Sequence, residues 1–263
     1  MNKLKLIAFL LMTQLGMKAQ EMKHCGSAQA EAKLRQEHPE LVPQINDLEN
    51  YLNSLDPSKF EKTRSGSRII PVVFHIVHNY GPENISDAQI HDAMRILNED
   101  YQLRNADSGA VVPAFKAIKA NVDWEFRLAR KDPDGNCTNG IDRIHSYKTY
   151  QADDKSKLNP WNRNYYFNVW VVNTIGAQGV AGYAYKPATA NSIFYYDGVI
   201  ILHDYIGSIG TGTLGRSRAL THEIGHCMNL DHTWGATNDP GVSCGDDGVQ
   251  DTPQTKGHDN CNN

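Results

Sequence analysis

The chain lacks a strong excess of either charge. Its 263 residues carry 26 Lys and Arg against 30 Asp and Glu, which gives a formal net charge of −4. Without a basic patch there is no electrostatic basis for binding nucleic acid, so we expect no nucleic-acid partner. The length allows one or two domains with a substantial core. The sequence does not define an oligomeric state.

Long apolar runs are missing everywhere except at the N-terminus. There the basic MNKLK is followed by the apolar LIAFLLM and by the polar TQLGMKAQ. This order predicts a secretory signal peptide over residues 1–20, because the apolar run is too short for a stable anchor. The alternative is a buried N-terminal helix. We expect a secreted protein, extracellular or exported across the inner membrane, with no membrane anchor.

Cysteine is scarce and odd in number. The chain holds five cysteines, namely Cys25, Cys137, Cys227, Cys244 and Cys261. In an exported protein an odd count leaves at least one thiol free or paired outside the chain. Spacing alone cannot assign disulfides. Cys227 is either buried or paired with Cys137, and a Cys244–Cys261 bridge is also open.

The stretch THEIGHCMNLDHTWG carries the chemistry. His222 and His226 are four residues apart, so on a helix they share one face and can reach one zinc ion, with Glu223 beside them. His232 can be the third ligand only if the helix stops and the chain folds back. Asn229 is the expected pivot, because Asn tolerates positive φ better than most residues.

Three neutral imidazoles would hold Zn²⁺ and leave a fourth position to water. The metal lowers the pKa of this water from about 15.7 toward about 7, and Glu223 can accept its proton and pass it to the leaving amine. The predicted reaction is hydrolysis of internal bonds of protein or peptide substrates. The alternative is a non-catalytic zinc-binding or interaction protein, or an inactive fragment, against which the intact Glu223 argues.

No glutamate follows Glu223 in the sequence. Gluzincin peptidases share HExxH but take a downstream glutamate as third ligand, so this class is excluded and His232 remains. The pattern HExxHxxNxxH from His222 to His232 resembles the metzincin zinc signature, which usually has Gly where Asn229 stands.

Further stretches are similar to the pappalysin family of metzincins, the ulilysin-like secreted endopeptidases. They are LGRSRALTHEIGH, HTWG, GDDGVQDTP and IIPVVFHIVH, and the resemblance covers about residues 68–263. It implies an α/β (α+β) fold, with a mixed twisted sheet over the zinc-binding helix. It also implies a sheet edge for an extended substrate, best matched by Ala181–Tyr185, and a calcium ion best matched by Asp247, Val249 and Thr252. A solvated acidic turn is the alternative for the calcium loop.

Cys25 lies in a Cys-Gly pair soon after the predicted signal peptide. A lipoprotein anchor needs small apolar residues before the cysteine, which MKH does not supply, and a structural disulfide stays open. The third interpretation is latency, in which a propeptide thiolate takes the fourth zinc position. Pappalysin-like zymogens resemble this arrangement. Residues 21–66 would then be the propeptide, Lys62–Arg68 the cut region and residues 67–263 the catalytic domain.

The local patterns predict a mixed set of strands and helices. A helix should begin after Ser86 as N-cap, with Gln89 in the capping-box position. Strands are expected over residues 69–78, 122–129, 166–172, 180–185 and 198–204. His75, His78 and His203 should lie on strands as core or edge residues, and the tryptophans Trp124, Trp161 and Trp170 in the core.

Two residue types are missing after the motif. No Met follows Met228 and no Tyr follows Tyr205, whereas metzincins place a Met-containing turn well after the third histidine. By this resemblance we expect a C-terminally incomplete precursor, truncated before that turn, with the lower subdomain mostly missing. The residues that set substrate preference are then not readable.

Overall fold

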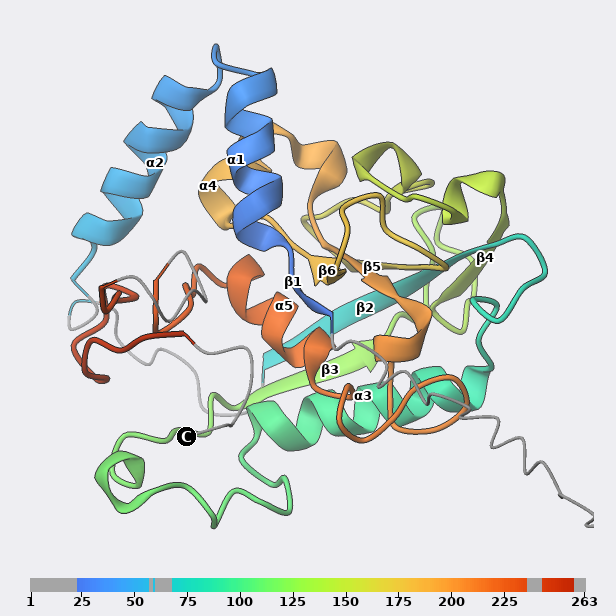
Figure 1. The fold of residues 1–263 in the computed structure, drawn as a ribbon. Coiled ribbons are helices and arrows are strands. Elements are labelled where there is room, and N and C mark those ends of the chain that lie inside the picture. Colours follow the sequence, from blue (N-terminus) through green and yellow to red (C-terminus); the bar gives the residue numbers. More distant parts are fainter. Residues whose placement is uncertain (1–22, 57–58, 60–67, 236–242, 258–263) are drawn as a thin grey trace, which may run out of the picture.

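A mixed sheet with helices on both faces forms the protein, seen in a computed structural model that describes residues 23–56, 59, 68–235 and 243–257 (Figure 1). Its strands are β1 (His24–Cys25), β2 (Arg68–His78), β3 (Trp124–Leu128), β4 (Ile141–His145), β5 (Phe167–Val172), β6 (Val180–Tyr183) and β7 (Val199–Leu202). Its α-helices are α1 (Ser27–Glu37), α2 (Val42–Ser54), α3 (Asp87–Tyr101), α4 (Pro187–Ser192) and α5 (Ala219–Cys227).

The strand order is β1-β6-β7-β5-β2-β3, with β4 paired to β2 as well. The long strand β2 pairs with β3 over its first half and with β4 over its second half. All pairs are parallel except β6 with β7. The inversion at β6 places an antiparallel strand next to β1 at one edge. The predicted α/β (α+β) class with a mixed twisted sheet is confirmed.

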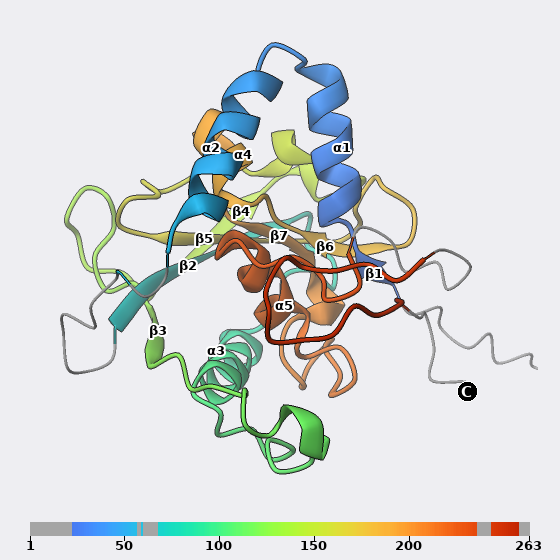
Figure 2. The same cartoon turned by 90° about the vertical axis from the view of Figure 1, so that its left-hand side faces the viewer.

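Helices cover the two faces unequally. In Figure 2, α3 and α5 lie below the sheet, whereas α1, α2 and α4 lie above it. Strands β5 and β7 are buried almost throughout, as expected for parallel strands covered on both faces. Among the described residues, no helix has the length and apolar character that crossing a membrane requires.

Helix α3 begins as the sequence predicts. The backbone N–H of Gln89 donates to Ser86 Oγ at 3.2 Å. The capping box is not completed, because the Gln89 side chain instead donates to the carbonyls of His203 and Ile206 at 3.0 and 2.9 Å. Buried Gln89 therefore ties α3 to the loop that leads into α5.

The sequence prediction of strands was partly wrong at their ends. The expected strands 180–185 and 198–204 stop at Tyr183 and Leu202, and His203 begins a single 3₁₀ turn rather than lying on a strand. Just past the strand, the carbonyl of His203 accepts a hydrogen bond from the Gln89 side chain of α3. Strand β4 was not predicted, since IDRIH is short and only half-buried.

His75 is a core residue, as expected. Its ring nitrogens lie 3.0 Å from Asp142 Oδ2 and 2.9 Å from Asn168 Oδ1, and the ring stacks on Trp170. His78 is buried at the end of the same strand. Trp170 and Trp161 are buried, whereas Trp124 is only half-buried, packed against the core.

Three predictions concern segments outside the described residues. They are the signal peptide over residues 1–20, nearly all of the expected cut region Lys62–Arg68, and any disulfide made by Cys261. These stay predictions.

Candidate metal centre

Helix α5 carries the first two candidate ligands and the candidate base. His222 and His226 project from one face of the helix, and Glu223 between them is only 2% exposed. Asn229 follows with φ of 70°, which confirms the predicted left-handed pivot. The backbone N–H of Leu230 then donates to the Gly225 carbonyl at 3.0 Å, which closes the helix and sends the chain back.

Folding back brings His232 to the other two imidazoles. His222 Nε2 lies 3.1 Å from His232 Nε2 and 3.2 Å from His226 Nε2. Two nitrogens bound to one tetrahedral zinc, with bonds of about 2.0–2.1 Å, would be about 3.4 Å apart. With Cys25 Sγ included, all four ligand atoms lie within 4.8 Å of one another. The donor set and its spacing therefore fit a single zinc ion.

The pKa values of the three imidazoles are lowered, which favours their neutral forms. The pKa values of His222 and His232 are lowered to about 4, first by loss of water around the rings and then by neighbouring histidines. His226 Nδ1 lies 2.8 Å from the Leu230 carbonyl, so this nitrogen carries the proton and Nε2 is left for the metal. Neutral rings are required for ligation, and at neutral pH these rings meet that requirement.

Glu223 has the environment of a general base. Burial raises its pKa to about 7, against the hydrogen bonds from Ser27 and Cys25 that lower it. Ser27 Oγ donates to Glu223 Oε2 at 3.0 Å, and Cys25 Sγ lies 3.6 Å from the same oxygen. A carboxylate with a pKa near the operating pH suits a group that accepts and returns a proton.

The N-terminal segment enters the site as strand β1. The backbone N–H groups of His24 and Gly26 donate to the carbonyls of Gly179 and Gly182, both at 2.8 Å. This pairing, parallel to β6, places Cys25 Sγ at 3.3 Å from His226 Nε2. The predicted meeting of Cys25 with the three histidines is therefore seen.

A side chain at position 26 would collide with strand β6. A Cβ built there would lie 2.6 Å from Val180 Cγ1. The close approach lets the chain turn from β1 into α1, so that the N–H of Ser27 points at Cys25 Sγ at 3.4 Å. Burial raises the pKa of the Cys25 thiol to about 12, with the charge of Glu223 adding to this. Ionisation of this thiol therefore needs a cation beside it.

Helices α1 and α2 make further contacts between the N-terminal segment and the rest of the protein, away from the metal site. Leu34 and Ile45 are buried. Thr189 Oγ1 donates to Glu31 at 2.6 Å, and Lys186 Nζ lies 3.9 Å from Glu49. Sequence segments far apart are thus joined by apolar packing and by polar contacts.

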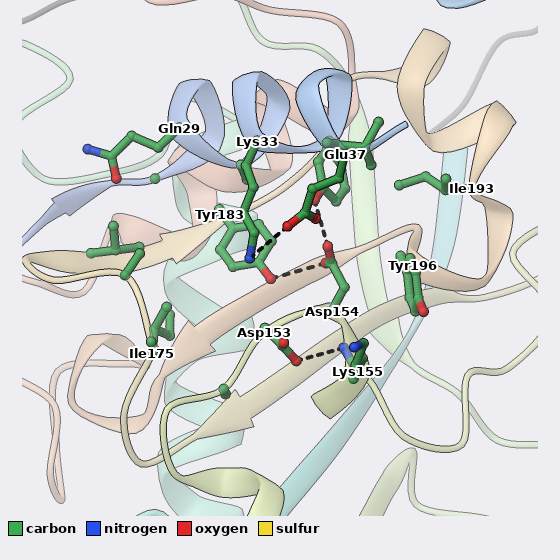
Figure 3. A pocket seen from close by; sticks show the side chains of 18 of the residues that line it. Gln29, Lys33, Glu37, Asp153, Asp154, Lys155, Ile175, Tyr183, Ile193 and Tyr196 are labelled. Atoms are coloured by element: carbon green, nitrogen blue, oxygen red, sulfur yellow. Dashed lines mark hydrogen bonds and ion pairs between the residues drawn. The ribbon is translucent and has the colours of Figure 1, made fainter. Parts of the chain in front are cut away.

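A cavity of about 470 Å³ lies between α1 and the loop after β4 (Figure 3). Lys33 and Glu37 face it from α1, and Asp154 faces it from the loop. Asp154 accepts hydrogen bonds from Tyr183 and Tyr185, and lies 3.1 Å from the fully buried Nζ group of Lys157. This network holds the end of β6, the strand on which β1 lies.

The predicted calcium residues lie in an exposed loop. The N–H of Val249 donates to Asp247 Oδ1 at 3.0 Å, and Thr252 lies a few residues on. Within the described part of the chain, the clustering of three or more His, Cys, Asp or Glu ligand atoms is found at Cys25 and the three histidines, and not in this loop.

The suggested Cys137–Cys227 disulfide is wrong. Both thiols are free, as are those of Cys25 and Cys244 among the described cysteines. Cys227 ends α5, which packs against β6 and β7, whereas Cys137 is exposed beyond β3 at the opposite end of the strand order.

Two functional residues escaped sequence reasoning. Ser27 contacts the Glu223 carboxylate, and Gly26 permits the close approach of β1 to β6. The Cys-Gly pair was visible in the sequence, but a serine one position later carries no recognisable signal.

Comparison with known proteins agrees with this geometry. The family described as peptidase M43, pregnancy-associated plasma protein-A, matches residues 150–263. Mature mirolysin of Tannerella forsythia, solved in complex with a cleaved peptide, is 38% identical, with a TM-score of 0.65 and coverage of 74% of each chain. A promirolysin mutant from the same organism is 35% identical, with a TM-score of 0.75, covering 89% of this chain and 77% of that one.

Curated relatives are similar over variable lengths. An extracellular metalloprotease of Colletotrichum graminicola is 46% identical over 79 residues, 27% of this chain and 26% of that relative. A second match to an extracellular metalloprotease of this organism is 26% identical over 237 residues, 86% of this chain and 74% of that relative. Extracellular metalloprotease 1 of Coccidioides posadasii is 27% identical, with 58% of its length covered.

The chain belongs to the peptidase M43 family, the pappalysins, a family of zinc metalloendopeptidases. The resemblance to the pappalysin family, drawn from the zinc motif and the stretches around it, is thereby confirmed.

Proposed function

We propose that this chain is the precursor of a secreted zinc endopeptidase that hydrolyses internal peptide bonds of proteins. The observation that carries the proposal is the convergence of His222, His226 and His232 on one point beside the buried Glu223. Three neutral imidazoles with one further position for water or substrate are the ligand set of a catalytic zinc site.

Glu223 is assigned the role of general base. Its pKa of about 7 lets it take a proton from the attacking water and return that proton to the leaving amine at neutral pH. When bound, zinc would supply the Lewis acid that lowers the pKa of water and polarises the scissile carbonyl.

The β6 edge is assigned to substrate binding. The carbonyls of Gly179 and Gly182 accept hydrogen bonds from β1, and this pairing with an extended segment supports the assignment. An extended substrate would add a strand in the same place once β1 has left. The predicted segment Ala181–Tyr185 overlaps this edge from Ala181 to Tyr183, where the strand ends.

Residues 21–66 are assigned to a propeptide, ahead of a catalytic domain over residues 67–263. The support is that β1 occupies the substrate edge while Cys25 occupies the fourth position around the histidine cluster. Both must leave before a substrate can reach the site. Cleavage in the basic stretch Lys62–Arg68 would release them.

Export and a structural calcium complete the proposal. The relatives are named extracellular metalloproteases, which supports the assignment of residues 1–20 as a signal peptide. The oxygen-rich loop with Asp247, Val249 and Thr252 is assigned to a calcium ion. The hydrogen bond from Val249 to Asp247 already curls this loop.

The direct test replaces Glu223 by Gln in the full chain. Zinc content and cleavage of a denatured protein are measured after limited trypsin treatment, with Glu125→Gln as the control, because the Glu125 carboxylate contacts Arg127 on the edge strand β3. We expect E223Q to retain zinc and lose cleavage by at least 10²-fold. Zinc binding without cleavage in the unmutated chain would favour the non-catalytic alternative.

A further inference from the structure

The hydroxyl of Ser27 bridges two groups of the catalytic domain. It donates to Glu223 Oε2 at 3.0 Å and accepts from the backbone N–H of Ala184, also at 3.0 Å. Ser27, Ala184 and Glu223 are all buried. The bridge joins segments 157 and 196 residues apart in the sequence. It therefore exists only while α1 is docked.

A hydroxyl group is chemically suited to the position between the Glu223 carboxylate and the Ala184 amide. A serine Oγ has one proton to donate and lone pairs to accept, so one group satisfies both a buried carboxylate and a buried amide. Ala184 follows β6 directly, at the edge where β1 lies. Ser27 thus contacts the candidate base and the sheet edge at once.

Helix capping does not explain the hydroxyl. Ser27 is the first residue of α1, and the residue before it, Gly26, makes no side-chain cap. The Ser27 hydroxyl points away from its own helix, to Glu223 and Ala184. Its two partners both belong to the catalytic domain.

We propose that Ser27 is a second inhibitory latch, which ties up Glu223 and the Ala184 amide independently of the Cys25 thiol. Latency then has two parts. The Cys25 thiol lies against the histidine cluster and only more distantly, at 3.6 Å, against Glu223, whereas the Ser27 hydroxyl donates to that carboxylate at 3.0 Å. Displacing or modifying Cys25 alone leaves Glu223 bonded to Ser27. The latch rests on the proposed function only for the role of Glu223 as base.

Hydrogen exchange of the Ala184 amide tests the latch without measuring catalysis. The full chain is compared with S27A, S27T, C25A and the control Q36A, an exposed residue of the same helix, both with zinc and with a chelator. One hydrogen bond to a buried amide slows exchange substantially, so we expect S27A to exchange at least 10-fold faster at Ala184. S27T and Q36A should stay within about 3-fold of the unmutated chain.

The C25A variant separates the two latches. We expect its Ala184 amide to stay protected, because the Ser27 bridge persists without the thiol. Unchanged exchange in S27A, or loss of protection in C25A as large as in S27A, would overturn the proposal. If S27A instead undocks all of α1, so that the amides of α1 and Ala184 exchange together, Ser27 acts in helix docking and the proposal of a separate latch is overturned. Peptidase activity is measured separately, with the E223Q variant. The proposed peptidase function and the proposed Ser27 latch can therefore be refuted independently of each other.

Discussion

The backbone N–H of Gly26 donates to the carbonyl of Gly182 at 2.8 Å, so the N-terminal segment and the β6 edge are joined main chain to main chain. Side-chain contacts of Cys25 and Ser27 depend on this register. The segment is therefore held beside the histidine cluster both by backbone pairing and by side-chain contacts.

Replacing Gly26 by Ala should loosen this pairing. The new Cβ would lie 2.6 Å from Val180 Cγ1, and such overpacking costs about 1–3 kcal/mol. We expect G26A to release the N-terminal segment faster during limited proteolysis of the full chain. Gly109→Ala is the control, since a Cβ there meets nothing within 4 Å. Equal release rates for the two variants would contradict the role of β1 pairing.

Asn229 offers a test of the turn that delivers His232. Its φ of 70° is accessible to Gly and, at some cost, to Asn. We expect N229G to bind zinc normally, whereas N229V should lose about 1–2 kcal/mol of stability and bind zinc more weakly. Calorimetric zinc titration of the two variants measures this. Normal zinc affinity in N229V would mean that another feature of the chain sets the turn.

Glu223 should make stability depend on pH in the zinc-free chain. Burial raises its folded pKa from 4.5 to about 7, so between these values the folded chain binds more protons than the unfolded chain. The contribution of protonated Glu223 to the stability of the unmutated chain is therefore lost as pH rises from about 4.5 to about 7. E223Q lacks this loss. We expect the difference in Tm, E223Q minus unmutated, to increase across this window, measured by calorimetry with a chelator present. A constant difference would show an ordinary pKa.

Asp154 should matter for stability far more than its position on a loop suggests. Lys157, whose side chain is fully buried, would lose its carboxylate partner in D154A, and uncompensated buried charges cost about 3–5 kcal/mol. Chemical denaturation measures this loss. The control is K33A, which breaks the exposed Lys33–Glu37 pair visible in the same cavity and should change stability by less than about 0.5 kcal/mol (Figure 3). A small effect of D154A would mean that the Tyr196 carbonyl and the rings of Tyr183 and Tyr185 suffice for Lys157.

Much of the site follows from local rules. The spacing of His222 and His226 places them on one helix face, whatever surrounds the helix, because the helical repeat is a backbone property. Asn229 marks the turn for a similar reason, since its φ preference is local. The N-cap at Ser86 was also readable, whereas the side chain of Gln89 was not, because its partners lie more than a hundred residues away.

The zinc motif, the class of chemistry and the mixed α/β character can be read from the order of the residues, because each depends on short-range periodicity and ligand spacing. The contacts of Cys25 with His226 and of Ser27 with Glu223 emerge only in the folded chain, across separations of 201 and 196 residues. The tertiary structure also decided that Cys137 and Cys227 stay apart. Such contacts arise from sheet order and helix docking, where many weak interactions act together and no single residue pattern records the outcome.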